Sequence, residues 1–269
     1  MNEIEQALDK VASIVRETGV ENDITYFSFH RKRFRRMAET VTRVCQPGSL
    51  VLDIGSHYLH SSLLLTFLGY RVVPMDVEAF WQLDHIRQRA QAHGLTPIVE
   101  NNLEKIPALA QQENVYDLIL FTEIFEHITF NPLLFWKRIY TIIKNNGIIY
   151  ITTPNSLTLY GIARTLANLV RFKGIGLGVN AIFDTVTYGH HWKEYSTKEI
   201  RAYFRKMNDG FSVSMSKYHY QPYTPTGLKS RLRIGLINIG NCIPFFREAI
   251  EAIVRVNKSY DWKINMPDY

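Results

Sequence analysis

The sequence has little cysteine, no low-complexity tract and no long apolar run. Its 269 residues include only two cysteines, Cys45 and Cys242. These lie far apart and lack the spacing of a metal-binding or CxxC pair. This argues against a disulfide framework and a zinc site, so we expect no metal and a reducing, cytoplasmic location. No apolar stretch could span a bilayer, and the N-terminal residues lack a basic segment followed by an apolar one. We therefore expect a soluble protein without stable membrane insertion.

The composition is that of an ordinary globular chain, with 46% apolar and 21% charged residues. An α/β fold of this length can form one domain. We expect a single domain over residues 1–269, with N-terminal helices over 1–48 and a core over 49–220. The core would hold an insertion at about 156–189, and a C-terminal extension would cover 221–269.

The net charge of +6 is unevenly distributed. Basic side chains crowd one short stretch, which contains His30, Arg31, Lys32, Arg33, Arg35 and Arg36. Such a stretch can bind nucleic acid, a phosphorylated substrate or lipid headgroups. Apolar residues recur through it at helical spacing, at Phe34, Met37, Val41 and Val44. We favour the interpretation that the charges form the solvated side of a packed helix, and nucleic acid is the less favoured partner.

Short β-rich runs alternate with helical patterns along the middle of the chain. The predicted strands are 50–54, 71–75, 97–100, 118–122, 147–152 and 211–217. The predicted helices between them are 59–69, 79–93, 131–144 and 197–207. Because each crossover must pack back on the sheet, this order predicts a doubly wound α/β fold with a mostly parallel sheet and helices on both faces. Two further helices are expected over 1–45 and one near 244–256.

The loop after the first predicted strand is the expected ligand site, because ligands of open α/β sheets bind beyond the carboxyl ends of the strands. Gly55 permits a tight turn there, and Asp76 follows about 20 residues later, where an acid can accept hydrogen bonds from ribose hydroxyls. A dinucleotide needs three glycines around its pyrophosphate, and this loop continues with Ser56, His57 and Tyr58 instead. The loop therefore argues against a nicotinamide oxidoreductase and favours a cofactor with a ribose and no phosphate.

Six segments strengthen this interpretation: VLDIGS, VPMDV, ENNLEKIP, YDLILFTEIFEHI, NNGIIYITTPN and GHHWKEYSTKEI. In this order and spacing they cover about residues 50–207 and resemble the class I S-adenosylmethionine-dependent methyltransferases, especially bacterial members that modify small molecules. The resemblance implies a Rossmann-like, seven-stranded sheet with N-terminal helices and a helical insertion. It also implies S-adenosyl-L-methionine as the cofactor.

The resemblance carries residue roles with it. Asp53 would orient the amino-acid end of the donor, Asp76 would hold its ribose, and Glu123 would line the pocket beside the methyl group. The full set of expected cofactor-binding residues is Asp53, Gly55, Ser56, Asp76, Val77, Asn102, Leu103 and Glu123, with Asn102 and Leu103 beside the adenine. The chain departs from the family where His57 and Leu59 replace later glycines of the first loop, and bulky side chains there would crowd the donor.

Candidate groups for the acceptor side lie in two segments. Glu126 and His127 follow the fourth predicted strand, and His190, His191 and Glu194 lie in GHHWKEY. Imidazole titrates near neutral pH, so His127 is the first candidate for a catalytic base and His191 the second. A histidine at either place can equally be a structural hydrogen-bonding group.

Two apolar segments have no assigned partner. Within the insertion, an apolar helical stripe comprises Leu159, Ile162, Ala163, Leu166 and Val170. It predicts either a substrate lid or a helix that extends the core. The segment 232–246 is also apolar with flanking arginines, which is typical of a transient membrane contact or a dimer surface.

The leading hypothesis is methyl transfer from S-adenosylmethionine to an oxygen or nitrogen of a small molecule, such as a sugar, a glycan precursor, a quinone or a lipid-linked acceptor. The alternative is a noncatalytic binding module that keeps the fold and uses residues 30–36 to hold an anionic partner. The sequence leaves the acceptor's identity and a homodimer open, because a fold does not encode its substrate.

Overall fold

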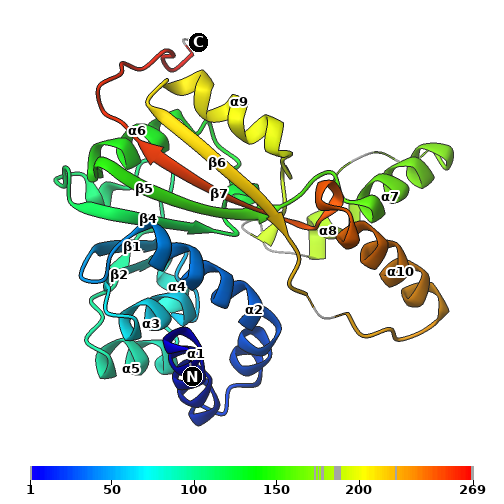
Figure 1. The fold of residues 1–269 in the computed structure, drawn as a ribbon, viewed down its shortest axis with the longest axis horizontal. Helices are drawn as coiled ribbons and strands as arrows, with labels where there is room; N and C mark the ends of the chain where they lie inside the picture. The colour runs from blue at the N-terminus through cyan, green and yellow to red at the C-terminus, as the bar shows by residue number, and fades with distance from the viewer. Residues whose placement is uncertain are drawn as a thin grey trace.

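A computed structural model describes residues 2–172, 174, 176, 179–184, 189–221 and 223–267. Its seven strands are β1 (Leu50–Ile54), β2 (Arg71–Asp76), β3 (Ile98–Val99), β4 (Tyr116–Thr122), β5 (Ile143–Pro154), β6 (Phe211–Tyr218) and β7 (Ala249–Val256) (Figure 1). The helices are α1 (Glu3–Glu17), α2 (Glu21–Val44), α3 (His60–Phe67), α4 (Glu78–Trp81), α5 (Asp84–Ala92), α6 (Leu133–Ile142), α7 (Leu159–Val170), α8 (Val179–Asp184), α9 (Thr197–Met207) and α10 (Leu228–Cys242). None of these described helices is long and apolar enough to cross a membrane.

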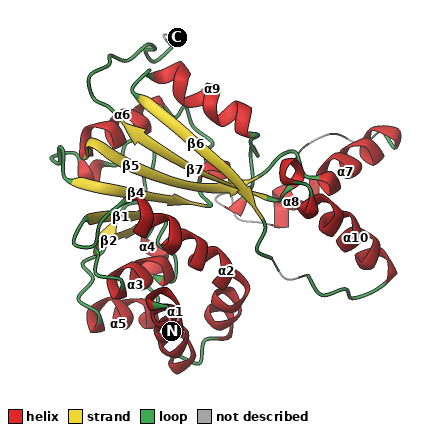
Figure 2. Ribbon diagram, viewed as in Figure 1, coloured by secondary structure: helices red, strands yellow, loops and turns green. Residues whose placement is uncertain are grey.

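The strands form one sheet in the order β3-β2-β1-β4-β5-β7-β6 (Figure 2). Strands β1 to β5 pair in parallel, whereas β7 runs antiparallel to both of its neighbours. The strand order reverses between β1 and β4, which makes their carboxyl ends the switch point of a doubly wound sheet. The predicted fold class is therefore confirmed, including the two helices before the sheet and the mostly parallel pairing.

The predicted helix near residues 244–256 is wrong. Pro244–Phe246 forms one short 3-10 turn, and Ala249–Val256 is β7, which lies inside the sheet between β5 and β6. Its buried residues Ile250, Ala252, Val254 and Val256 alternate along the strand and join one core. This period of two is the strand signal. The sheet thus extends past residue 220, and α10 is the helix of the C-terminal part.

Other differences concern the ends of elements. The predicted helix 79–93 is divided into α4 and α5, because Leu83 between them has an extended backbone. The predicted helix 131–144 ends at Ile142, and β5 begins at the next residue. A capping box at Ser196 and Glu199 begins α9, since each residue's side chain accepts a hydrogen bond from the other's backbone N–H.

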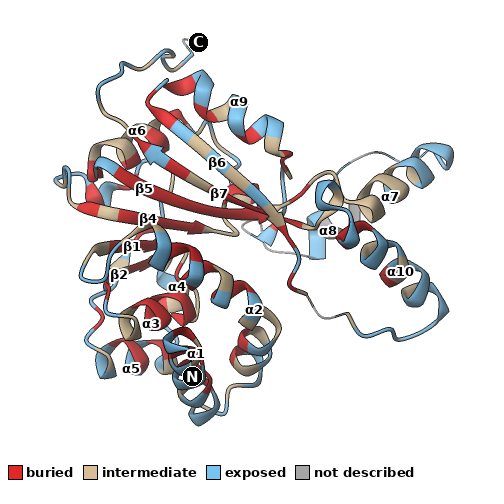
Figure 3. Cartoon of the chain, in the orientation of Figure 1, coloured by how far each residue is buried: buried red, intermediate tan, exposed pale blue. Residues whose placement is uncertain are grey.

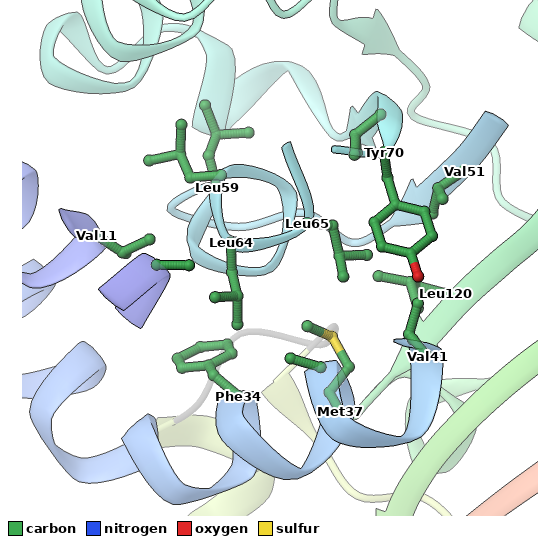
Figure 4. Packing of buried hydrophobic residues seen from close by; sticks show 14 of the residues in the cluster. Val11, Phe34, Met37, Val41, Val51, Leu59, Leu64, Leu65, Tyr70 and Leu120 are labelled. Carbon is green, nitrogen blue, oxygen red and sulfur yellow. The ribbon is translucent and has the colours of Figure 1, made fainter. Parts of the chain in front are cut away.

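Each face of the sheet carries its own hydrophobic core, because successive strand residues point to opposite faces. Leu118 and Leu120 of β4 belong to one core with residues of α1, α2 and α3. Figure 4 shows Leu120 in this core. Ile119 and Phe121 pack with α6 and α9 on the other face. Burial is accordingly concentrated in the strands and the inner helix surfaces (Figure 3).

The basic stretch of α2 is paired within the chain. Arg31 binds Glu5 and Asp9 of α1, and Arg35 binds Glu5. Arg36 binds the buried Glu251 of β7, with its Nη2 at 2.8 Å from Oε2, and Arg33 lies 3.4 Å from Glu123. Phe34, Met37 and Val41 are buried on the same helix. The packed-helix interpretation is confirmed, and the stretch is not a free patch for an anionic partner.

Asp23 forms a buried ionic cluster between α2 and the first crossover. Its two carboxylate oxygens lie 2.6 Å from Nε2 of His60 and 2.5 Å from Nη2 of Arg89. Arg89 also donates to the carbonyl of Tyr58, at 2.5 Å. Burial alone would raise the pKa of Asp23, but the hydrogen bonds from His60 and Arg89 outweigh it and lower that pKa. The cluster fixes the loop before α3 to α2 and α5.

We expect Asp23→Ala to lower the free energy of unfolding by about 3–5 kcal/mol, because it leaves the buried guanidinium of Arg89 without its partner. Urea denaturation measures this. The matched control is Asp84→Ala, which breaks the exposed pair between Asp84 and Arg87 and should leave the midpoint unchanged within error. Equal effects of the two substitutions would contradict the structural role given to Asp23.

Candidate active site

The loop after β1 crosses the end of β2. The backbone N–H groups of Gly55 and Ser56 both donate to the carbonyl of Met75, at 2.9 and 3.2 Å. The next N–H, that of His57, donates to Oδ2 of Asp76 at 2.6 Å. The two motifs that the sequence singled out, at the ends of the first two strands, are therefore in direct contact at the switch point of the sheet.

Asp53 and Asp76, the acids at the ends of these two strands, are buried or nearly so. Asp53 accepts hydrogen bonds on Oδ2 from the hydroxyls of Ser61 and Ser62, each at 2.6 Å. Its Oδ1 is buried without a hydrogen-bond partner among the described residues. Burial raises the pKa of Asp53 to about 6 and that of Asp76 to about 6, although hydrogen bonds to each carboxylate oppose the shift. A positively charged or hydrogen-bond-donating ligand would relieve this cost.

Gly55 and Ser56 suit close approach of a ligand. Gly55 has a φ of +71°, and a Cβ built there would lie 2.4 Å from Cδ1 of Ile124, so a side chain at this position would be strained and would displace Ile124. Ser56 is buried, and its Oγ has no hydrogen-bond partner among the described residues. Unpaired buried polar atoms are uncommon, which makes this loop a candidate ligand site.

His57 and Leu59, which replace the family's later glycines, have φ values of +49° and +66°. These are left-handed conformations that favour glycine, so the loop keeps its backbone path although the glycines are lost. The Leu59 side chain is fully buried in the core around α3 (Figure 4). The His57 ring packs between Tyr26 of α2 and Phe80 of α4, with ring centroids 4.6 and 4.5 Å away.

The remaining expected cofactor residues flank β2 and β3. Val77 is the N-cap residue of α4, and its N–H donates to Oδ1 of Asp76 at 2.7 Å. Asn102 is exposed in the loop after β3, and Leu103 is half-buried against the core. The sequence interpretation missed Glu100, a buried acid that accepts from the N–H groups of Asn102 and Ala108 at 2.7 and 2.9 Å and shapes this loop.

Glu123, directly after β4, meets α2. It has a φ of +55°, and its Oε2 lies 3.4 Å from Nη1 of the buried Arg33. Arg33 also donates to the hydroxyl of Tyr26 at 3.0 Å. The sequence interpretation treated Arg33 as part of a basic stretch and missed this role. A signal existed, because Arg33 precedes Met37 and Val41 at intervals of four and so shares their buried face.

Glu126, His127 and His191, the acceptor-side candidates predicted from the sequence, lie close together. The 3-10 turn Phe125–His127 follows β4, and the backbone carbonyl of Glu126 accepts from the N–H of Trp192 at 2.9 Å. The His127 and His191 rings therefore lie with their centroids 5.0 Å apart. One ligand atom from each of the three residues lies within 4.8 Å of the others. The structure thus brings together the two histidines that the sequence proposed separately.

The environment of this trio is partly apolar. Burial, with the nearby charge of Glu123, raises the pKa of Glu126 well above its ordinary value. Burial also lowers the pKa of His127. The hydrogen bond to Glu194 raises the pKa of His191. The pKa values of the two histidines are thus shifted in opposite directions, and the neutral form is favoured at His127.

A family model described as "Methyltransferase domain" matches residues 29–231, and no curated protein matches the sequence. A SAM-dependent methyltransferase from Archaeoglobus fulgidus superimposes with a TM-score of 0.53 and 17% identity, over 86% of this chain and 99% of that chain. The complex between the Haloferax volcanii Trm112 methyltransferase activator and the putative methyltransferase contains a chain that superimposes with a TM-score of 0.57 and 14% identity, over 93% of this chain and 97% of that chain. A putative sarcosine dimethylglycine methyltransferase from Galdieria sulphuraria gives 0.53 and 16%, over 87% and 88%.

Because His57 has a positive φ, we expect glycine to be more stable than alanine at this position, which is the reverse of the usual order. We expect His57→Gly to be more stable than His57→Ala by about 1 kcal/mol, because a Cβ is disfavoured in the left-handed region. Urea denaturation of the two variants measures the difference. At neighbouring Tyr58, which does not have a positive φ, the same two substitutions should show the opposite order. Alanine being the better residue at both positions would show that the loop does not have this backbone.

Proposed function

The chain belongs to the methyltransferase domain family, and on that premise we propose that it transfers the methyl group of S-adenosyl-L-methionine to an oxygen or nitrogen of a small-molecule acceptor. The solved structures described as SAM-dependent methyltransferases support this choice of donor. The proposal depends on one juxtaposition, in which the loop after β1 contacts the carboxylate of Asp76 through the N–H of His57.

The residues at this edge of the sheet fit the donor. S-adenosylmethionine carries an ammonium group, a ribose and a positively charged sulfur. Buried oxygens without hydrogen-bond partners among the described residues are present at Asp53 (Oδ1), Ser56 (Oγ) and Glu123 (Oε1). Asp53 would bind the ammonium group, Asp76 would accept from the ribose hydroxyls, and Glu123 would face the sulfonium side. Val77, Asn102 and Leu103 would border the adenosine, and Gly55 leaves room for it.

Residues on the acceptor side would position the nucleophile and take its proton. When bound, S-adenosylmethionine supplies a methyl group on a good leaving group, so positioning accounts for most of the acceleration. Nδ1 of His127 lies 2.9 Å from the carbonyl oxygen of His190. A carbonyl only accepts, so Nδ1 donates and the neutral ring keeps its lone pair on Nε2. His127 Nε2 is thus the first candidate to accept the acceptor's proton, and His191 is the second.

The alternative of a noncatalytic module is not favoured. It required residues 30–36 to hold an anionic partner, and Arg31, Arg33, Arg35 and Arg36 instead pair with acids of the same chain. Those pairs leave no concentrated free charge on α2 for such a partner.

The acceptor class that we favour is lipid-linked. The chain enters α7 directly from the carboxyl end of β5, and α10 leads through Pro244–Phe246 into β7 at the same edge, because β7 is antiparallel to β5. Both helices project from that edge (Figure 1). No residue of α7 is buried, so it does not extend the core. Residues 173, 175, 177, 178 and 185–188 of the predicted insertion lie outside the described residues.

The surface of α7 and α10 is apolar and basic. Its exposed apolar side chains are Leu166, Leu169, Val170, Phe172, Leu228, Leu232, Leu236, Ile239, Ile243 and Phe245. Its exposed basic side chains are Arg164, Arg171, Lys229, Arg231 and Arg233. The sequence has no Asp or Glu over 160–183 or 210–247. Apolar side chains among cations match an anionic lipid surface, whereas a second copy would bring like charges together.

Hollows in this surface lie beside the same helices. One of about 490 Å³ is lined by Tyr160 of α7 and by Leu232 and Arg233 of α10, among others. A second of about 100 Å³ lies between Leu159 and Phe246. Neither is lined by a residue from the ends of β1 or β2, so they are better suited to an acceptor's apolar part than to the donor.

We expect Asp76→Asn to weaken the binding of S-adenosylhomocysteine by about 10- to 100-fold, since hydrogen bonds to a charged group contribute about 1.5–3 kcal/mol. Titration calorimetry measures this. Because burial raises the pKa of Asp76 to about 6, the carboxylate becomes protonated as the pH falls through 6. The affinity of the unmodified chain should therefore drop between pH 7.5 and pH 5, and the drop should be smaller in the variant.

The control for that titration is Asp209→Asn, an exposed acid beyond α9 that pairs with Lys263, and it should bind S-adenosylhomocysteine like the unmodified chain. Unchanged affinity in Asp76→Asn would refute the proposed donor site. A residual fall with pH in that variant is expected, because burial also raises the pKa of Asp53 to about 6.

We expect the chain to sediment with vesicles of phosphatidylcholine and phosphatidylglycerol and to remain in solution with phosphatidylcholine alone. Raising the salt concentration should weaken the association, because the Debye length shortens. Leu232→Glu should abolish sedimentation, whereas Tyr260→Glu, an exposed residue of the C-terminal segment, should not. Absence of sedimentation, or a dimer that Leu232→Glu dissociates, would exclude the lipid surface as the occupant.

A further inference from the structure

We propose that Glu126, His127 and His191 bind one divalent transition-metal cation, such as Zn²⁺, at the acceptor side of the site. One ligand atom from each lies within 4.8 Å of the others. They come from two segments that are tied together by hydrogen bonds from the N–H groups of Trp192 and Lys193 to the carbonyl of Glu126, at 2.9 and 3.4 Å. The cluster is thus held by backbone contacts rather than by surface side chains alone.

Both histidines are oriented as metal-ligating histidines are. Such residues usually donate one ring N–H to a carbonyl or carboxylate, which leaves the other nitrogen for the cation. His127 has Nδ1 at 2.9 Å from the carbonyl of His190. His191 has Nδ1 at 3.3 Å from Oε1 of Glu194. In each ring, Nε2 remains to bind a cation.

Glu126 supplies an unpaired oxygen. The residue is 1% exposed, and Oε2 accepts a hydrogen bond from the hydroxyl of Thr153 at 2.8 Å. Oε1 is buried without a hydrogen-bond partner among the described residues, and it lies 4.0 Å from Nε2 of His127. A buried carboxylate oxygen without a donor is costly, and a cation between Oε1 and the two imidazoles would satisfy it.

The donor set selects the kind of cation. Imidazole ligands suit zinc, copper, iron and nickel, whereas calcium, magnesium and manganese prefer oxygen ligands. Two histidines and one carboxylate leave coordination positions open, which is typical of catalytic rather than structural sites. Because His191 is 44% exposed at its side chain, the open side faces the mouth of the site.

A cation here deepens the proposed function and rests on it. An acceptor hydroxyl bound to the cation would be more acidic, so its O–H bond breaks with the proton leaving to water and the electron pair staying on oxygen. The oxygen is then a stronger nucleophile for the donor's methyl group. A cation on Nε2 of His127 also occupies the lone pair that a base would use, so the metal and base roles of His127 exclude one another.

The test uses the full chain without an affinity tag, stripped with EDTA and titrated with Zn²⁺ by calorimetry. We expect one equivalent to bind. Glu126→Gln and His127→Gln should each weaken binding by more than about 100-fold, since loss of a ligand exceeds the about 10- to 100-fold loss caused by outer partners. His191→Gln, at a partly exposed residue, should do the same without threatening the fold. The control His219→Gln, at an exposed histidine of the same chain, should bind like the unmodified chain.

Substitution of Co²⁺ for Zn²⁺ gives a second readout, because the visible absorption of bound cobalt reports its ligands. The visible absorption of the Co²⁺-loaded protein should change in His127→Gln and His191→Gln and stay the same in His219→Gln. Absence of binding by the unmodified chain, or equal binding by all variants, would overturn the proposal. Titration of the same preparations with S-adenosylhomocysteine separates the metal site from the proposed function. If the chain binds Zn²⁺ but not S-adenosylhomocysteine, the metal site stands and the proposed function is refuted.

Discussion

The fold depends on the buried polar contacts that tie α2 to both halves of the sheet. Near its beginning Asp23 binds Arg89 of α5, in its middle Arg33 faces Glu123 at the end of β4, and farther along Arg36 binds Glu251 of β7. A buried charge that loses its partner costs several kcal/mol, so each contact penalises any shift of the helix along the sheet. The same contacts set the wall of the ligand site, because Arg33 and the loop before α3 are both positioned by α2.

Unsatisfied polar atoms gather where the function is expected. Seven buried side-chain oxygens lack hydrogen-bond partners among the described residues. Four of them, at Asp53, Ser56, Glu123 and Glu126, lie near the carboxyl ends of β1 and β4 or shortly after them, and the others are at Gln112, Thr152 and Tyr218. Folding alone does not explain them, because buried carboxylates elsewhere in the same chain are satisfied, as both oxygens of Asp23 are. Departures from polar satisfaction are typical of sites that await a ligand. Glu123 connects the two sides of the site, since it pairs with Arg33 and its charge contributes to the raised pKa of Glu126.

Local patterns in the sequence predicted the fold class and the contact between the ends of β1 and β2, because alternation and turn chemistry are local properties. They did not predict the partners of α2, since Arg36 and Glu251 are 215 residues apart in the sequence. They also misassigned β7, because its other face carries Ala249, Glu251 and Ile253, which are buried or partly buried as well, so a clean alternation of apolar and polar residues is missing. Bulky residues at His57 and Leu59 suggested a crowded loop, but backbone conformation rather than residue size decides its path, and both adopt the angles that glycine would. Helical spacing places Arg33 on the buried face of α2, but its partner Glu123 is far away in the sequence, so a local pattern could not predict the pair.

The distribution of charge within the chain separates the routes of donor and acceptor. Acids are concentrated inside the carboxyl edge of the sheet, at Asp53, Asp76 and Glu123, where a cationic donor gains most from a poorly solvated site. The helices that leave the same edge carry bases and no acids, over 160–183 and 210–247. A cationic donor is therefore repelled by the projecting helices and attracted to the interior, whereas an anionic headgroup experiences the reverse. Under the proposed function, an acceptor held in a lipid surface would then approach from the side of α7 and α10, and the donor would bind beside Asp53 and Asp76.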